Sequence, residues 1–330
     1  MEFKEFILQK DDANRRIDRI LKKLLPTTSL SVIYKSLRSG FIKINNKKIS
    51  QDYKTNEKDI LRIPLFLLSE ESHPEKTVNK PKKNLDLNSI TLFKNEHILI
   101  LNKPYGISVH TGNNNEITLQ ELVIKNFSTN SVSFKPGPLH RIDKNTTGII
   151  IFSQSLLGAQ IFSEVLQKHH IKKEYLAILE GTLQEKIELR DTITKNDKTS
   201  SFKTMKISNS TLEGKEAISL VTPINWGILK IPHKEMPITL ANIEITTGRK
   251  HQIRLQCAHK GFPLLGDTAY GGTQLPNIFG QNLFLHDWKM TFEEKTDILN
   301  IPSSIQAPLP ENFLRLLEKC LKKDDSHFIL

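Results

Sequence analysis

The sequence has little cysteine and no long hydrophobic run. Its 330 residues contain only two cysteines, Cys257 and Cys320, which are too few for a disulfide framework and too far apart for a CxxC zinc pair. This usage favours a reducing compartment, so we expect a cytoplasmic protein. Apolar runs such as 149–152 are far shorter than the about 18 residues of a membrane span, and residues 1–10 lack a signal-peptide core. We therefore expect no membrane association.

Several motifs of nucleotide, metal and hydrolase chemistry are also missing. The chain contains no G-x-x-x-x-G-K-[ST], no G-x-G-x-x-G, no H-E-x-x-H and no G-x-S-x-G. Its eleven histidines show no zinc-like spacing with acidic partners. We therefore expect neither a cofactor nor a metal.

Positive charge, by contrast, is abundant and unevenly placed. The net charge is +11, and residues 13–64 hold 13 Lys or Arg against 4 Asp or Glu. Such a block attracts polyanions, nucleic acid first and anionic membrane second. The alternative is a solvated basic surface that serves solubility alone.

The basic block predicts a compact module over residues 1–66. Apolar residues at helical spacing from 17 to 25 predict one helix, and Gly40 suits the end of a second. An Asn45-Asn46 turn predicts a hairpin, which a strand follows at 60–63. We expect the polar helix faces to contact nucleic acid through Arg15, Arg16, Lys35 and Arg38.

The remaining chain predicts a linker, a larger domain and a helical extension. Residues 67–89 are rich in Ser, Glu, Lys and Pro, as linkers are. Strand-like and helical patterns mix over 90–300, which predicts an α+β domain with a mixed or antiparallel sheet. Residues 301–330 include an apolar helix face that we expect to pack on the body. The predicted strands are 98–101, 148–152, 175–179, 217–221, 238–245 and 283–285, and the predicted helices are 119–127, 156–169 and 251–259.

Three polar segments in this domain carry candidate site residues. In the first, His140 and Arg141 precede Asp143, which lies on a turn just before a buried strand. A carboxylate held there could act as a nucleophile or a base. The alternative is an Asx-turn, in which the side chain bonds its own backbone.

The other two segments offer an aromatic ring and cationic groups. Tyr175 begins a strand, and its ring could stack on a base or its phenol could move a proton, unless it is an ordinary half-buried strand tyrosine. Gly248 permits a tight turn into a helix that carries Arg249 and Arg254. This helix start could bind an anion, or Arg254 could pair with a buried carboxylate. A surface patch without chemistry is the alternative.

Taken together, these segments resemble the RluA-type family of pseudouridine synthases. The resemblance spans about residues 90–295, and the N-terminal block resembles an S4 RNA-binding domain. The combination is closest to the subgroup that acts on large-subunit ribosomal RNA, type C. Departures from the family pattern are small: Ile142, Thr147, and Asp287 where the family tends to have Ala. The matching segments are Leu101–Gly106, His140–Gly148 (H-R-[LI]-D-x-x-T-[ST]-G), Lys173-x-Tyr175, Thr247–Arg254 and Gly266-Asp267-x-x-Tyr270-Gly271.

The resemblance implies an isomerase that converts specific uridines to pseudouridine. Its implied fold is an S4 module followed by a catalytic domain on a long sheet with a central cleft. Its implied partner is large-subunit ribosomal RNA or an assembly precursor of it, and we expect a monomer. Asp143 would attack C1′ or remove a sugar proton, Tyr175 would stack on the uracil, and Arg254 would pair with Asp143. The implied substrate contacts are Arg141 in the space of the flipped base, Leu265 as a pocket wall, and His140 and Arg249.

Two other functions compete with this interpretation. One is a non-catalytic RNA-binding or ribosome-assembly protein on the same scaffold, which would bind RNA without isomerising it. The other is a hydrolase or nuclease that uses His140 and Asp143, a class that usually needs a metal.

Overall fold

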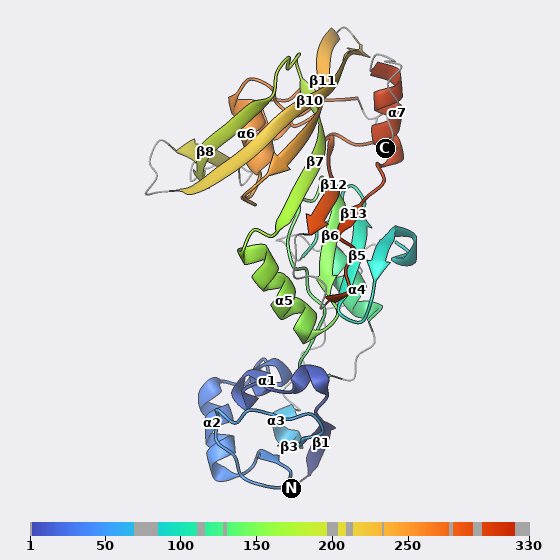
Figure 1. Cartoon of the computed structure of the whole chain (residues 1–330). Helices are drawn as coiled ribbons and strands as arrows, with labels where there is room; N and C mark the ends of the chain where they lie inside the picture. Colours follow the sequence, from blue (N-terminus) through green and yellow to red (C-terminus); the bar gives the residue numbers. More distant parts are fainter. Residues whose placement is uncertain are drawn as a thin grey trace.

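The computed structural model describes residues 2–68, 85–110, 116–127, 131–196, 204–208, 214–232, 234–276, 280–292 and 299–320. A small N-terminal module lies at one end of a larger body (Figure 1). Most of the predicted linker 67–89, and the last part of the predicted extension 301–330, lie outside the described residues.

The N-terminal module consists of a three-stranded antiparallel sheet and short helices. Its strand order is β1-β3-β2. Ser29 caps α2, and Gly40, with a φ of 75°, ends it as expected. The first strand was not predicted, because it lies before the basic block and three of its five residues are exposed. The elements are β1 (Phe3–Ile7), a 3-10 helix (Lys10–Asp12), α1 (Ile17–Leu24), α2 (Leu30–Ser39), β2 (Lys43–Ile44), β3 (Ile60–Pro64) and α3 (Leu65–Leu68).

A ten-stranded mixed sheet forms the body and confirms the α+β class. The order is β4-β5-β6-β12-β7-β11-β10-β8-β9, and β13 pairs with β12. All neighbours are antiparallel except β6 and β12, which are parallel. The strands are β4 (Thr91–Lys94), β5 (Ile98–Lys103), β6 (Thr147–Ser153), β7 (Ile171–Glu180), β8 (Ile187–Lys195), β9 (Met205–Ser208), β10 (Lys215–Ile231), β11 (Lys234–Ile245), β12 (Leu285–Phe292) and β13 (Ser304–Gln306).

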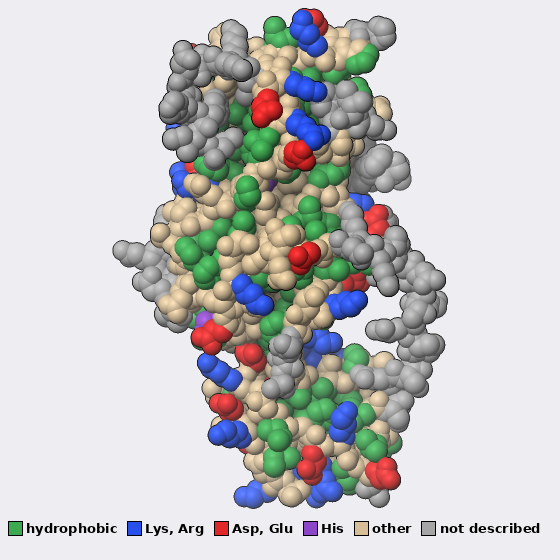
Figure 2. Space-filling view, turned by 90° about the vertical axis from the view of Figure 1, so that its right-hand side faces the viewer, with side chains coloured by type: hydrophobic (Ala, Val, Ile, Leu, Met, Phe, Trp, Pro, Cys, Tyr) green, Lys and Arg blue, Asp and Glu red, His purple; other side chains and the backbone are tan. Residues whose placement is uncertain are grey.

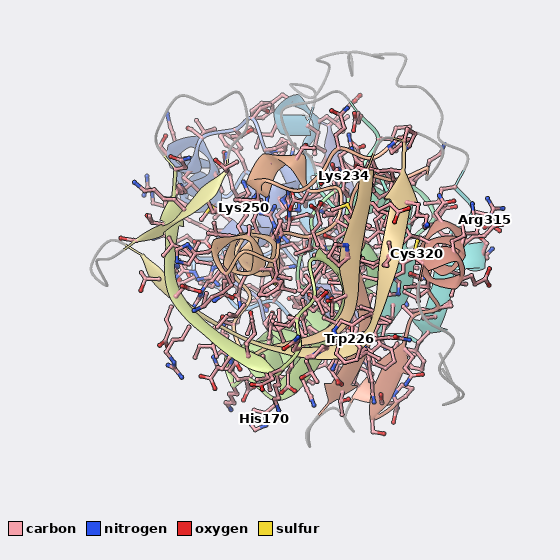
Figure 3. The ribbon with its side chains drawn as sticks, turned by 90° about the horizontal axis from the view of Figure 1, so that it is seen from above. His170, Trp226, Lys234, Lys250, Arg315 and Cys320 are labelled. Carbon is pink, nitrogen blue, oxygen red and sulfur yellow. The ribbon has the colours of Figure 1, made fainter. Side chains whose placement is uncertain are left out.

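Alternation along the strands places helices on both faces of the sheet. On β6, Ile149 and Ile151 pack with α5, whereas Ile150 and Phe152 pack with α4. Viewed from above, the long strands curve around α6, and α7, with Arg315 and Cys320, lies on the opposite face (Figure 3). The helices are α4 (Leu119–Lys125), α5 (Leu156–Gln167), α6 (Gln252–His259) and α7 (Glu311–Cys320). No helix of the described ranges has the length and apolarity of a membrane span.

The parallel pair β6–β12 is short and tightly packed. Only two residue pairs form its ladder, His286 with Thr147 and Asp287 with Gly148. A Cβ at Gly148 would overlap the carbonyl oxygen of Asp287, and its φ of 107° also disfavours any other residue. Gly148 therefore allows β12 to lie directly beside β6.

The module is anchored to the body by two acidic residues. The carboxylate of Asp12, which is fully buried, accepts hydrogen bonds from the Ser133 amide at 3.1 Å and the Ser131 hydroxyl at 2.7 Å. Asp11 accepts a 2.8 Å hydrogen bond from the amide of Leu156, the first residue of α5. Arg15 adds a 2.5 Å hydrogen bond from Nη1 to the Ser133 hydroxyl.

Candidate active site

A cleft of roughly 350 Å³ opens between the turn before β6 and the segment that leads into α6. The two segments are more than a hundred residues apart in the chain, and the curved sheet brings them together. Six of the seven expected site residues of the body line this cleft: His140, Arg141, Asp143, Tyr175, Arg249 and Arg254.

The turn that carries Asp143 is fixed from below by a buried lysine. Lys103 is fully buried, and its Nζ donates hydrogen bonds to the carbonyl oxygens of Lys144 at 2.9 Å and Ile107 at 3.0 Å. The Thr146 amide closes the turn on the Asp143 carbonyl at 3.1 Å. The Asp143 carboxylate faces Arg254 and His251 rather than its own backbone, so the geometry differs from an Asx-turn.

Arg254 joins Asp143 to a second carboxylate. Its Nη1 lies 3.3 Å from Oδ2 of Asp143, while Nε and Nη2 lie 2.7 and 2.8 Å from the two oxygens of Asp267. Its guanidinium also stands 5.1 Å above the ring of Tyr270. Burial lowers the pKa of Arg254, but the two carboxylates outweigh burial and raise it. The expected pairing of Arg254 with Asp143 is present, and the sequence alone did not reveal its stronger bond to Asp267.

His251 is a further residue of the cleft that sequence reasoning did not single out. Its Nε2 lies 3.6 Å from Oδ2 of Asp143, and its Nδ1 lies 2.7 Å from the Tyr270 hydroxyl. Burial lowers its pKa to about 4, so the ring is neutral at pH 7. His251 is also the left-handed residue before α6, with a φ of 55°, the turning position that we had assigned to Gly248. The sequence did contain one indication of this role, because His251 lies within the segment 247–254 that matches the family pattern.

Tyr175 lies on β7 at the floor of the cleft and is 7% exposed. Its register partner on β12 is Asp287. Burial, and then Asp287, raise the pKa of the Tyr175 phenol well above its usual value, so the phenol stays protonated near neutral pH. An aromatic ring with an apolar face and a protonated hydroxyl group is suited to stack on a base.

His140 contributes structure rather than charge. Its Nε2 accepts a 3.1 Å hydrogen bond from the amide of Ile151. Burial holds its pKa well below the ordinary value, so the ring is neutral. Arg141 is exposed at the rim, and the Arg249 Nε donates a 2.9 Å hydrogen bond to the Glu216 carbonyl.

Leu265 does not lie where we expected it. It is fully buried in the cluster beneath α7, with Phe284 and Phe313, and does not line the cleft. The reason is that successive residues point to opposite faces of the sheet. Leu264 packs on the face that α6 covers, so Leu265 points to the face that α7 covers. The cleft wall instead contains Ile253 and Leu285.

The expected nucleic-acid contacts of the N-terminal module divide into two groups. Arg15 is half-buried against Ser133, and the Arg16 guanidinium pairs with Asp18 at 2.7 Å. Lys35 and Arg38 are exposed on α2. On the face in Figure 2, basic and acidic side chains are interspersed over module and body. The free basic groups therefore form no single-sign patch on that face.

The groups able to hold a metal are dispersed in the part of the chain that the structure describes. No three His, Cys, Asp or Glu residues of the described ranges gather as a metal site would require. Both cysteines are free thiols, Cys257 buried and Cys320 half-buried.

Comparisons with known proteins agree on one family. A family model described as RNA pseudouridylate synthase matches residues 97–259. The chain is 31% identical to ribosomal large subunit pseudouridine synthase C of Buchnera aphidicola subsp. Baizongia pistaciae, over 95% of this chain and 96% of that protein. It is 28% identical to the protein of the same name from Escherichia coli K12, over 94% of both chains.

Two solved structures show the same fold. Human RNA pseudouridylate synthase domain containing 1 matches with a TM-score of 0.56 at 20% identity, over 73% of this chain and 91% of that one. Human RNA pseudouridylate synthase domain containing 4 matches with a TM-score of 0.55 at 18% identity, over 72% of this chain and 96% of that one.

Proposed function

The chain belongs to the RluA-type RNA pseudouridine synthase family, and from this premise we propose that it isomerises specific uridines to pseudouridine in large-subunit ribosomal RNA. The observation that carries the proposal is the meeting of Asp143, Arg254 and Tyr175 in one cleft, from three separate chain segments. The names of the relatives supply the substrate class.

The reaction needs a carboxylate, a base pocket and no external energy. The N1–C1′ bond of uridine breaks, the uracil turns, C5 bonds to C1′, and the C5 proton leaves as N1 gains one. Asp143 supports the first step, either by attack on C1′ or by removal of a sugar proton. Arg254 directs the Asp143 carboxylate into the cleft, because Asp267 fixes the other two nitrogens of the guanidinium.

The target uridine must leave its stack to reach Asp143. Flipping a base costs a few kcal/mol and costs least in loops, so we propose structured loops as targets. Tyr175 then stacks on the uracil, and Arg141 at the rim fills the vacated space. A cleft of roughly 350 Å³ lies in the size range of small-ligand pockets, which suits a single nucleotide.

The N-terminal module supplies affinity in this proposal. We assign residues 1–66 to an S4-like RNA-binding domain, 90–300 to the catalytic domain and 301–330 to a C-terminal extension. Lys35 and Arg38 are exposed and suited to phosphate contacts, which position RNA without reading its sequence. Free thiols fit a cytoplasmic protein, and we propose a monomer.

Substitution of Asp143 tests the proposal. The gene is deleted, and the cells are complemented with either the wild-type protein or the Asp143→Asn variant. Pseudouridines are then mapped in their ribosomal RNA. We expect the wild type to restore specific pseudouridines and the variant to restore none, while purified variant still binds the RNA. Glu311→Gln, an exposed carboxylate on α7, serves as the control. Activity of Asp143→Asn within about tenfold of wild type refutes the role of Asp143, and RNA binding by the wild type without isomerisation supports the non-catalytic alternative.

A further inference from the structure

A buried carboxylate behind the cleft is not used by the mechanism above. Asp287 is 0% exposed and lies on β12 between Gly148 of β6 and Tyr175 of β7. Neither of its oxygens has a partner with hydrogen-bond geometry among the described residues. The groups that stabilise its charged form are the Lys173 ammonium and the Tyr175 hydroxyl.

An unsatisfied buried carboxylate is costly, so its position calls for a reason. Taking a charged group out of water without full pairing costs several kcal/mol, and an alanine would avoid that cost. Asp287 does not line the cleft itself, but Lys173 and Tyr175 both do. Because strands β7 and β12 are antiparallel neighbours in register at this point, the carboxylate and the phenol project from the same sheet face. Asp287 can therefore act on a bound nucleotide only through these two side chains.

We propose that Asp287 is a positioning residue, whose carboxylate draws the Tyr175 hydroxyl and the Lys173 ammonium to the floor of the cleft and so sets the plane on which the uracil stacks. This inference rests on the proposed function for its catalytic consequence. An asparagine at this position keeps the volume but removes the negative charge that attracts both groups.

The ionisation of Asp287 makes this arrangement sensitive to pH. Burial raises the pKa of Asp287 to about 7, against the opposing effects of Lys173 and Tyr175. Above pH 7 the carboxylate is charged and attracts the phenol, and below pH 7 it is protonated and the attraction is lost. Strand β7 presents Lys173 and Tyr175 to the Asp287 carboxylate, and β6 presents the backbone of Gly148. Two further groups interact with these side chains: the neutral His140 with Lys173, and Asp143 with Tyr175.

The first measurement does not require activity. The five tyrosines are labelled with 3-fluorotyrosine, and the Tyr175 resonance is assigned by its loss in Tyr175→Phe. We expect the 19F shift of Tyr175 to titrate with a midpoint near 7 in the wild type and to lose this step in Asp287→Asn. A Tyr175 resonance that does not titrate in the wild type, or that titrates equally in Asp287→Asn, overturns the proposal.

The second measurement is the pH profile of pseudouridine formation. We expect kcat to fall roughly tenfold in Asp287→Asn at pH 8, because the electrostatic attraction that places the phenol is lost, with KM for the RNA unchanged and the rising limb near pH 7 abolished. Asp287→Ala should behave alike, and Glu311→Gln, an exposed substitution on α7, should match the wild type. An Asp287→Asn profile identical to that of the wild type overturns the proposal. If the wild type forms no pseudouridine, the proposed function fails and the 19F titration still decides the role of Asp287.

Discussion

Arg254 is held by Asp267 through two hydrogen bonds, whereas it reaches Asp143 through one nitrogen only. Asp267 is 3% exposed, so this bidentate pair is well shielded from water. The arrangement fixes the guanidinium from behind and leaves the Asp143 carboxylate open toward the cleft. Asp267 thus sets the position of the Arg254 guanidinium relative to the Asp143 carboxylate.

Breaking the pair from the Asp267 side should harm both stability and activity. Asp267→Asn leaves Arg254 with a single carboxylate, and removal of one partner of a buried ion pair costs about 3–5 kcal/mol. We expect a lower free energy of unfolding in urea and, because misplacement by 1 Å can cost about 100-fold, a fall in kcat of that order. Glu311→Gln removes an exposed arginine–carboxylate pair on α7 and should change neither quantity. An active, fully stable Asp267→Asn enzyme would show that Asp143 alone suffices to place Arg254.

Gly148 should tolerate no side chain. A Cβ there overlaps the Asp287 backbone, and the φ of 107° adds backbone strain. We expect Gly148→Ala to destabilise the protein by more than about 3 kcal/mol, measured by urea unfolding. Gly137→Ala is the matched control, since no atom lies within 4 Å of its added Cβ. Equal stability of the two variants would contradict the close packing of β6 on β12.

Two exposed residues of α2 should contribute to the salt dependence of RNA binding. Each of Lys35→Gln and Arg38→Gln removes one cation, so log Kd against log salt should lose about one unit of slope per phosphate contact removed. Lys230→Gln removes an exposed cation of β10 that already pairs with Glu235 and should leave the slope unchanged. Filter binding across a salt series gives the slopes. If all three variants have the slope of the wild type, α2 is not part of the RNA-binding surface.

Local patterns singled out three residues of the cleft, and the family resemblance added the pairing of Arg254 with Asp143, but neither revealed the other partners. Asp143, Tyr175 and Arg254 each stood out because polar groups interrupt apolar strands, and the cleft contains all three. The bond between Arg254 and Asp267, and the register of Tyr175 against Asp287, depend on how distant strands pair. No spacing within one segment contains that information.

The errors in the predicted fold have similar causes. The expected strand 283–285 overlaps β12 only at Leu285, and β12 runs on to Phe292 through partly exposed residues that include Lys289. Strands β8 and β9 lie near the sheet edge and are partly exposed, so they lack a continuous apolar run. Leu265 was assigned to the wrong face because two adjacent leucines give no indication of which one faces the cleft.

The two-pair ladder between β6 and β12 has a consequence for how the protein responds to its ligand. The turn with Asp143 continues into β6, whereas Arg254 belongs to the part of the body built on β7, β10 and β11. A nucleotide held by both residues therefore spans the junction of the ten-stranded sheet with the fewest paired residues. Binding of the nucleotide and pairing of β6 with β12 are therefore thermodynamically coupled, because a ligand that binds only the paired state stabilises it. We expect amides of this junction to gain the most hydrogen-exchange protection when RNA binds.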